Sequence, residues 1–215
     1  MVIPREARRI TYSSKIRKLK TIFLSARQKS FIEGSLLGDG SLVSSWAKKS
    51  GNYRFMVSHS IKQQEYIEWK YEQLKPFVLT PPRLYKPTQA LSFRTISHPE
   101  MTEIHRIFYK NDTKILPKNI EEIISNPFSL AVWFMDDGNL FRSGKYTPGY
   151  HLNTQSFTKD ENHMMAKMFR DIWNVQCSLQ KNHCKYRLYI VSGSKEIYRN
   201  IIEDYILPSM KYKLG

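Results

Sequence analysis

The chain has 215 residues, of which 41% are hydrophobic and 13% aromatic, so it carries enough apolar material to bury a globular core. Its 34 lysines and arginines outnumber 19 acidic residues, and the net charge of +15 points to a polyanionic partner, either nucleic acid or an acidic membrane surface. No apolar run approaches the roughly 18–20 residues of a membrane span, and the basic residues are spread along the chain, so the composition favours nucleic acid and no membrane partner.

The first 24 residues form a predicted basic arm, because they are rich in arginine and lysine and contain a single acid, Glu6. Transit peptides share this composition, but a DNA-binding arm is the interpretation we prefer. No secretory signal is expected, and Cys177 and Cys184 are predicted to be free thiols in a reducing compartment. The sequence is therefore assigned to an intracellular protein of an organelle or a prokaryote.

A stretch of nine residues occurs twice, over 32–40 and 130–138, and each copy is an apolar run that ends in Asp-Gly. The glycine is the ordinary stop of a helix, where a left-handed conformation is expected. The aspartates, Asp39 and Asp137, are unusual there, because a carboxylate at the negative end of the helix dipole is disfavoured by about 0.3–1 kcal/mol. One such ending reads as a simple turn, but two predict a nearby cation, for which a hard divalent metal is the natural candidate.

The same order of elements follows both stretches. Ser25 and Gln28 form a predicted capping box for the first motif helix, and Asn126 and Pro127 begin the second. After them come, in the first repeat, strands near 41–46 and 53–60, a helix over 62–76, strands near 83–86 and 91–97 and a helix over 99–110; in the second, strands near 139–145 and 150–157, a helix over 159–174, strands near 177–181 and 186–192 and a helix over 195–206.

This order predicts an α+β fold of two pseudo-twofold-related α-β-β-α-β-β-α repeats, with antiparallel sheets and the motif helices packed at the interface. The predicted divisions are a basic arm (1–24), a first repeat (25–112), a connecting segment (113–125) and a second repeat (126–215). Gly34 and Gly38 lie four residues apart on one helix face, and each costs roughly 0.5–1 kcal/mol relative to alanine. We therefore expect close approach of the second helix, whose matching residues, Val132 and Asp136, are larger.

Both nine-residue stretches resemble, position by position, the motif that names the LAGLIDADG homing endonucleases, and segments 152–157 and 210–214 are similar to its monomeric, two-repeat members. The resemblance runs from about Phe31 to the C-terminus. It implies a monomer that hydrolyses one phosphodiester on each strand of a long, asymmetric double-stranded DNA target, leaves short 3′ overhangs and serves intron homing. Two alternatives stay open: an intron maturase whose partner is intron RNA, and a DNA-binding regulator with an inactive site.

The resemblance also implies the metal site. Asp39 and Asp137 are expected to hold Mg²⁺, for which Mn²⁺ can substitute, with the backbone carbonyls of Gly38 and Asp136 as further ligands. Two carboxylates brought together repel each other unless a proton or a metal ion lies between them. The side chain of Asp136 points about 100° away from that of Asp137 on a helix, so we assign it to the helix interface.

Two lysines have matched positions: Lys114 follows Asp39 by 75 residues, and Lys213 follows Asp137 by 76. An ammonium group beside a reacting phosphate stabilises the charge that develops there. A solvated surface lysine is the alternative for each, but the matched spacing and the resemblance to the family's active-site basic residues favour catalysis. Gln155 is assigned to the second site as an organiser of solvent or phosphate.

The predicted strands alternate apolar residues with long polar ones, and a two-stranded ribbon fits the major groove of DNA. The polar face of each sheet is therefore expected to form half of a saddle over the duplex. The residues predicted to contact DNA are Arg54, Ser58, His59, Lys62, Arg83, Lys86, Arg94, Arg142, Lys145, Asn153, Lys181, Lys185 and Arg187. Each is first assigned to phosphate, because half to two-thirds of such hydrogen bonds go to the backbone; for His59 a structural role is the alternative.

Overall fold

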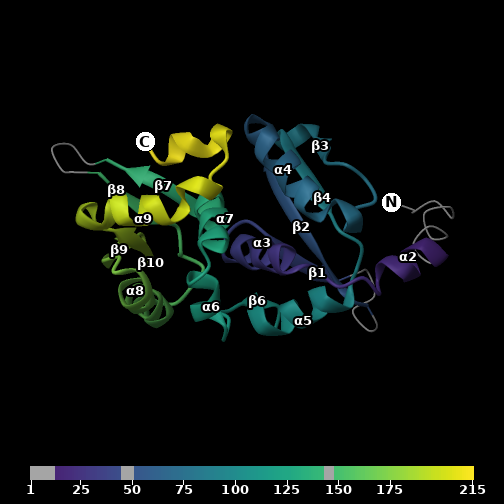
Figure 1. Ribbon diagram of the computed structural model, residues 1–215, viewed down its shortest axis with the longest axis horizontal. Helices are drawn as coiled ribbons and strands as arrows, with labels where there is room; N and C mark the ends of the chain where they lie inside the picture. The colour runs from purple at the N-terminus through teal and green to yellow at the C-terminus, as the bar shows by residue number, and fades with distance from the viewer. Residues whose placement is uncertain (1–12, 45–50, 143–147) are drawn as a thin grey trace. The chain divides into compact units, whose positions relative to one another are not determined.

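The computed structural model describes residues 13–44, 51–142 and 148–215 (Figure 1). Two compact units are distinguished by their internal contacts. Unit 1 holds the described residues up to Lys29 together with Ser41–His105, and unit 2 holds Ser30–Gly40 together with Arg106–Gly215. The boundaries predicted for the two repeats differ from these units, because the first motif segment packs against the second motif helix and so belongs to unit 2.

Unit 1 is built on a four-stranded antiparallel sheet in the order β1-β2-β4-β3. Its strands are β1 (Ser41–Ser44), β2 (Tyr53–Ser60), β3 (Arg83–Tyr85) and β4 (Ala90–Arg94). Helix α4 (Gln64–Leu74) packs against β2 and β4 (Figure 1). The buried side chains of Phe55, Val57 and Phe93 face this helix and form the core of the unit.

Unit 2 contains a sheet with the same antiparallel order, β7-β8-β10-β9. Its strands are β7 (Gly138–Phe141), β8 (Gly149–Leu152), β9 (Cys177–Asn182) and β10 (Lys185–Ile190). Helix α8 (Lys159–Trp173) covers β9 and β10, and α7 (Pro127–Asp137) packs against α9 (Lys195–Ile202) and the first two strands. Rings of Phe134, Tyr150, Phe169 and Tyr198 lie edge to face in the core between these elements. The repeated strand order confirms the predicted α+β class with antiparallel sheets.

Further elements join these two sheets and their helices. They are α2 (Ser14–Leu19), α3 (Ala26–Leu37), α5 (Pro99–Phe108), α6 (Ile120–Ile124), the hairpin β5 (Tyr109–Lys110) and β6 (Thr113–Lys114), and the 3₁₀ helices η1 (Ile61–Gln63), η2 (Lys75–Phe77), η3 (Lys86–Thr88), η4 (Ser192–Ser194), η5 (Glu203–Tyr205) and η6 (Pro208–Lys213). The hairpin and α6 were not predicted. Part of the predicted basic arm, residues 14–19, is the helix α2, and its Ile16 is buried. Within the described ranges, every helix is too short or too polar to cross a bilayer.

The predicted helix caps are present. Ser25 and Gln28 exchange the two hydrogen bonds of a capping box, at 3.0 and 3.2 Å, and the Asn126 side chain accepts from the first-turn amides of α7. The predicted left-handed glycine after the second motif helix is wrong. Gly138 has an extended conformation, with φ −82°, and begins β7 directly. It is required for space, since a Cβ there would come within 2.1 Å of the Phe134 ring.

The first motif segment and α7 pack at very short distance. A Cβ at Gly34 would lie 2.4 Å from the carbonyl oxygen of Ser129, and one at Gly38 would lie 2.5 Å from the Cβ of Asp136. The Ser129 hydroxyl donates to the Ser30 carbonyl at 3.0 Å near the start of both helices. The N-terminal parts of the two helices therefore contact each other, and so do their C-terminal ends, which means that the helices run in the same direction. The close approach expected from the glycines is confirmed.

We predict that Gly34→Ala lowers the free energy of unfolding by about 1–3 kcal/mol, because the added methyl group overpacks the helix contact. The intrinsic preference of a helix for alanine, about 1 kcal/mol, acts in the opposite direction and is outweighed. Urea unfolding measures the difference. Gly193→Ala is the matched control, since its Cβ would meet nothing within 4 Å. Equal stability of Gly34→Ala and the wild type would contradict the close packing.

Candidate functional site

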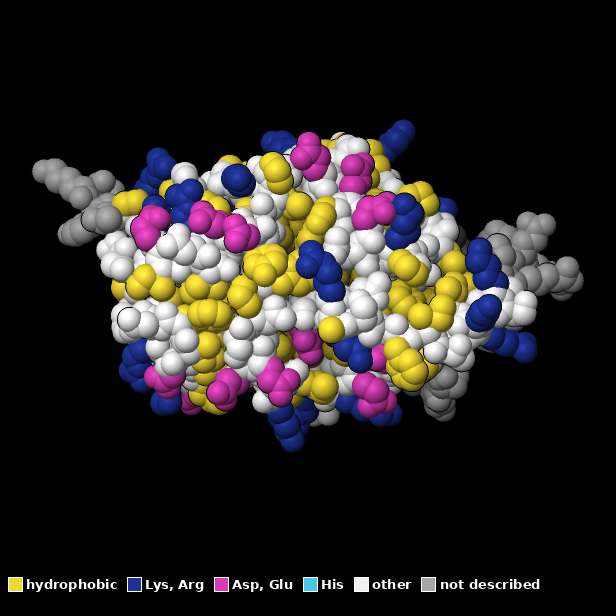
Figure 2. All heavy atoms as spheres, in the orientation of Figure 1, with side chains coloured by type: hydrophobic (Ala, Val, Ile, Leu, Met, Phe, Trp, Pro, Cys, Tyr) yellow, Lys and Arg dark blue, Asp and Glu magenta, His cyan; other side chains and the backbone are white. Residues whose placement is uncertain are grey.

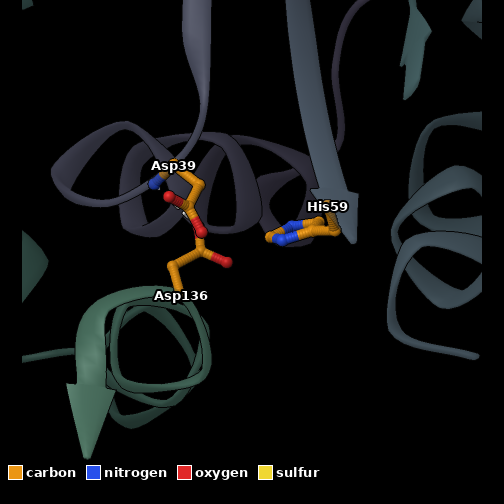
Figure 3. A group of neighbouring side chains, drawn as sticks. All are labelled: Asp39, His59 and Asp136. Atoms are coloured by element: carbon orange, nitrogen blue, oxygen red, sulfur yellow. Dashed lines mark hydrogen bonds between the residues drawn. The ribbon is translucent and has the colours of Figure 1, made fainter. Parts of the chain in front are cut away.

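The two motif acids lie at the ends of the two parallel helices. Asp39 follows α3 and is exposed, whereas Asp137 is the last residue of α7 and is partly buried. In Figure 3 the side chains of Asp39 and Asp136 point toward each other, and a carboxylate oxygen of one lies within 4.8 Å of a carboxylate oxygen of the other. His59, also labelled in Figure 3, belongs to unit 1.

The site carries an excess of negative charge. The pKa of Asp137 is raised from its ordinary value of 3.8 to about 7, first by burial and then by the nearby charges of Asp39 and Asp136. The ammonium groups of Lys114 and Lys213 act against this rise. The three aspartates therefore carry more negative charge than the two lysines neutralise, and a bound cation would offset the difference.

Each predicted lysine contacts the end of one motif helix. The Nζ of Lys114 donates to the Gly38 carbonyl at 2.9 Å. The Nζ of Lys213 donates to the Asp136 carbonyl at 2.9 Å and to the Met135 carbonyl at 2.6 Å. Gly38 and Asp136 hold the same position in the two motifs, directly before the acid. The structure thus brings one lysine to each helix C-terminus, where the dipole favours a positive charge.

The hairpin β5–β6 presents Lys114. Its two loop residues, Asn111 and Asp112, have positive φ angles of 51° and 59°, which is the geometry of a two-residue type I′ turn. Asn and Asp are the side chains that tolerate this conformation best after glycine. The Asn-Asp pair was therefore a signal for the hairpin that sequence reasoning missed.

The C-terminal segment places Lys213 beside the C-terminal end of α7. Met210 and Leu214 are buried on either side of it, and the Tyr150 hydroxyl donates to the Leu214 carbonyl at 3.0 Å. An open groove of about 690 Å³ runs beside this lysine. Its lining includes Asn139, Arg142, Asn153 and Tyr212.

Asn153, predicted to contact DNA, forms hydrogen bonds with the backbone of the second motif acid, Asp137. Its backbone N–H and its Nδ2 donate to the Asp137 carbonyl at 3.1 and 2.8 Å. The Gln155 amide in turn donates to the Asn153 Oδ1 at 3.4 Å. Gln155 therefore lies behind Asn153, next to the predicted second site. The turn that holds both residues ends β8 at Leu152, five residues before the predicted end of the strand.

Polar residues of unit 1 share the sheet face that is opposite α4. The pairs Met56–Arg94 and Ser58–Ser92, with Arg83 opposite Ser92, place these side chains on one face. The predicted DNA contacts on this face are Arg54, Ser58, Arg83 and Arg94. Burial, and then the nearby charge of Arg94, lower the pKa of the Arg54 guanidinium, so a polyanion here would meet closely spaced cations. Lys62 and Lys86 are exposed just beyond β2 and β3.

His59, which was predicted to contact DNA, does not lie on this face of the sheet. Side chains alternate along a strand, so His59 shares the side of Phe55 and Val57 rather than that of Ser58. It is 5% exposed, and its ring lies 4.9 Å from that of Tyr66 on α4. The alternative, a structural histidine, fits its position in unit 1.

The register of the second sheet separates the basic residues predicted there. Lys185 lies opposite Asn182 and Arg187 opposite Gln180, so both share the face away from α8. Lys181 lies opposite Tyr186 on the other face, where the Lys159 ammonium of α8 stands over the Tyr186 ring. Lys181 is thus exposed at the strand end but does not join the face of Arg187. Arg142 is exposed after β7, and Lys145 lies outside the described residues.

His151 was not predicted, although it lies on the same face as Arg187. Its Nε2 is 2.6 Å from the Gln180 Oε1, and burial lowers its pKa. Only the strand pairing reveals this cluster, because His151 and Gln180 are 29 residues apart in sequence.

Positive charge is distributed rather than gathered on the surface shown in Figure 2. Lys and Arg side chains there are interspersed with Asp and Glu and with apolar side chains. A polyanion therefore has no single basic patch on that surface, and the sheet faces described above are the better candidates.

The donors at the helix ends fit a hard divalent cation, which prefers oxygen ligands. Asp39 and Asp137 offer carboxylates, and the carbonyls of Gly38 and Asp136 lie directly before them. Both carbonyls already accept a lysine hydrogen bond, but a carbonyl oxygen has two lone pairs and can take a second partner.

Comparison with known proteins identifies the family. The model of the LAGLIDADG DNA endonuclease family matches residues 29–197, and the chain belongs to this family. Its class is that of the homing endonucleases, which are nucleases that depend on divalent metal ions.

Similar proteins span most of the chain. A probable intron-encoded endonuclease of Wickerhamomyces canadensis is 31% identical over 200 residues, which cover 89% of this chain and 85% of that protein. The solved structure of the homing endonuclease I-WcaI bound to its DNA recognition sequence matches with a TM-score of 0.84 and 27% identity, over 95% of this chain and 93% of that one. Cytochrome b mRNA maturase bI2 of Debaryomyces hansenii is 36% identical over 127 residues, 58% of this chain and 46% of that protein.

The raised pKa of Asp137 predicts a pH dependence of stability in the metal-free protein. Between its unfolded pKa of 3.8 and its folded pKa of about 7, the unfolded chain releases the proton while the folded chain retains it. Rising pH therefore favours unfolding, with a slope from this group that approaches about 1.4 kcal/mol per pH unit.

Urea unfolding in EDTA, at several pH values from about 4.5 to 7.5, measures this slope as the difference between the wild type and Asp137→Asn. In Asp137→Asn, the part of the decrease in unfolding free energy with pH that comes from Asp137 should be absent. The contributions of other titrating groups are the same in both proteins and cancel in the difference. Parallel curves for the two proteins would contradict the assignment.

Proposed function

We propose that this chain is a site-specific endonuclease that cuts both strands of a long, asymmetric DNA target and leaves short 3′ overhangs, in the service of intron homing. One observation carries the proposal. Asp39 and Asp137 end two parallel, closely packed helices, and Lys114 and Lys213 each bond the carbonyl directly before one of these acids. This arrangement supports the proposal of two similar sites, one for each strand.

The relatives support this proposal. One is named an intron-encoded endonuclease, and the structural neighbour is a homing endonuclease bound to its DNA recognition sequence. Since one chain supplies both acids and both lysines, we propose that it acts as a monomer. A relative named for cytochrome b mRNA supports an organellar setting.

Asp39 and Asp137, with the carbonyls of Gly38 and Asp136, are the proposed ligands of Mg²⁺, for which Mn²⁺ would substitute. A divalent ion bound there would lower the pKa of a water molecule in its coordination shell. It would also stabilise negative charge on the attacking and leaving oxygens of a phosphodiester. Asp137 is the last residue of α7 and Asp39 lies two residues after α3, so both carboxylates are placed beside the ends of packed helices.

Lys114 and Lys213 are proposed to stabilise the extra negative charge that a phosphate gains when a water oxygen attacks phosphorus and an ester P–O bond breaks. Both ammonium groups are already held at the helix ends by carbonyl hydrogen bonds. Little reorganisation is then needed during the reaction. Asn153 keeps the Asp137 backbone in place on the second site.

The sheet faces are the proposed DNA-binding surfaces. Side chains on or beside them are Arg54, Ser58, Lys62, Arg83, Lys86, Arg94, Arg142, Lys185 and Arg187. Arginine is suited to this task, since its planar guanidinium bonds phosphate or guanine in a bidentate manner.

A splicing maturase is the second candidate, because the maturase of D. hansenii is 36% identical to a part of this chain. Such a protein would use the same basic surface on intron RNA and would not need both acids. Cleavage of a randomised duplex library with Mg²⁺, compared with binding of structured intron RNA, separates the two. RNA binding without any duplex cleavage would favour the maturase.

We expect Asp39→Asn and Asp137→Asn each to abolish double-strand cleavage, because each removes one carboxylate of the metal site. DNA binding should stay within about tenfold of the wild type, which corresponds to roughly 1.4 kcal/mol. Plasmid linearisation and gel-shift titration measure the two effects. Linearisation by either variant at the wild-type rate would refute the metal-site assignment.

Lys114→Met and Lys213→Met should each slow the cleavage of one strand, by about 10–10³-fold by analogy with other transition-state donors. Each variant should accumulate nicked circles, with the nicks on opposite strands. End-labelled duplex identifies the nicked strand, and the double variant should cut neither strand well. Equal slowing of both strands in both single variants would mean that the lysines act on binding or on a shared step.

A further inference from the structure

The carboxylate of Asp136 lies between the two motif helices. The residue is only 8% exposed, whereas Asp39 is exposed. Its Oδ2 accepts a hydrogen bond from the Ser35 hydroxyl at 2.9 Å. It accepts another from the Asp39 backbone N–H at 3.3 Å, and Figure 3 shows these two aspartates facing each other. Glycine at position 38 admits this side chain, since a Cβ there would overlap that of Asp136. The second motif thus holds the backbone of the first acid.

The matching position of the first motif has no side chain with which to hold the second acid in the same way. The first-motif residue that matches Asp136 is Gly38, which has no side chain. Asp137 is held instead through its carbonyl oxygen, by the backbone and side-chain N–H groups of Asn153. The two acids therefore occupy matching places but are positioned by different residues.

We propose that Asp136 is a positioning residue for Asp39, and that it serves the strand cut with Asp39 rather than the strand cut with its sequence neighbour Asp137. This inference rests on the proposed nuclease function. A carboxylate is a strong acceptor for a backbone N–H, so it fixes the point from which the Asp39 side chain projects. Such control matters, because a misplacement of about 1 Å in an active site can cost about 10²-fold in rate.

Strand-resolved cleavage tests the proposal. Asp136→Ala should slow one strand by about 10–100-fold, and that strand should be the one slowed in Lys114→Met. The strand slowed in Lys213→Met should be cut at nearly the wild-type rate. Asp136→Asn retains an oxygen at the acceptor position and should recover most of the lost rate. Ser35→Ala, which removes only the companion donor, should produce a smaller loss on the same strand.

A measurement that needs neither DNA nor metal tests the contact itself. Amide hydrogen exchange, followed by NMR on ¹⁵N-labelled protein, should show the Asp39 N–H protected in the wild type and in Asp136→Asn. In Asp136→Ala this amide should exchange at least about tenfold faster, while amides in the core of α7 keep their protection. Unchanged core protection also shows that the variant is folded. If Asp136→Ala does not fold, Ser35→Ala and Asp136→Asn carry the test.

Several outcomes would overturn the proposal. These are slowing of the Lys213 strand, equal slowing of both strands, failure of Asp136→Asn to recover the rate, or unchanged exchange at Asp39 in Asp136→Ala. A different result would overturn the proposed function instead. If the wild-type protein cuts no DNA with Mg²⁺, the nuclease assignment fails, and the exchange experiment still decides whether Asp136 holds Asp39.

Discussion

Close, parallel packing of the first motif segment on α7 is the constraint on which the site depends. The backbone of Ser129 fits against Gly34, and Asp136 fits against Gly38, only because neither glycine has a side chain. Since the helices run in the same direction, their carbonyl ends and the negative ends of their dipoles coincide. The two acids and the two lysine-bonded carbonyls are thereby brought to the same end of the helix pair.

The same packing concentrates charge that is unfavourable for stability and useful for chemistry. Asp39, Asp136 and Asp137 crowd together, and the pKa of Asp137 rises to about 7, although Lys114 and Lys213 oppose the rise. A divalent cation would recover this cost by binding at the helix ends. Active sites commonly trade stability for function in this way. Because of the asymmetry between Gly38 and Asp136, the two acids occupy matching positions but are held by different residues.

Features coded locally or by symmetry could be predicted from the sequence. The helix caps, the order of elements, the close approach at Gly34 and the pairing of each lysine with one motif belong to this group. Features set by long-range register could not. The hydrogen bonds from Asn153 to the Asp137 carbonyl depend on where β8 ends, and the burial of His59 depends on which side of β2 faces α4. The buried acceptor role of Asp136 depends on a partner 101 residues away, Ser35.

Anomalous scattering from Mn²⁺, in crystals of the protein with a DNA duplex chosen by selection from a random library, tests the central claim most directly. We expect anomalous density within ligand distance of both Asp39 and Asp137. In Asp39→Asn or Asp137→Asn, the density beside the substituted residue should be lost. Density bound elsewhere on the protein, or retained in both variants, would contradict a metal site built from the two helix ends.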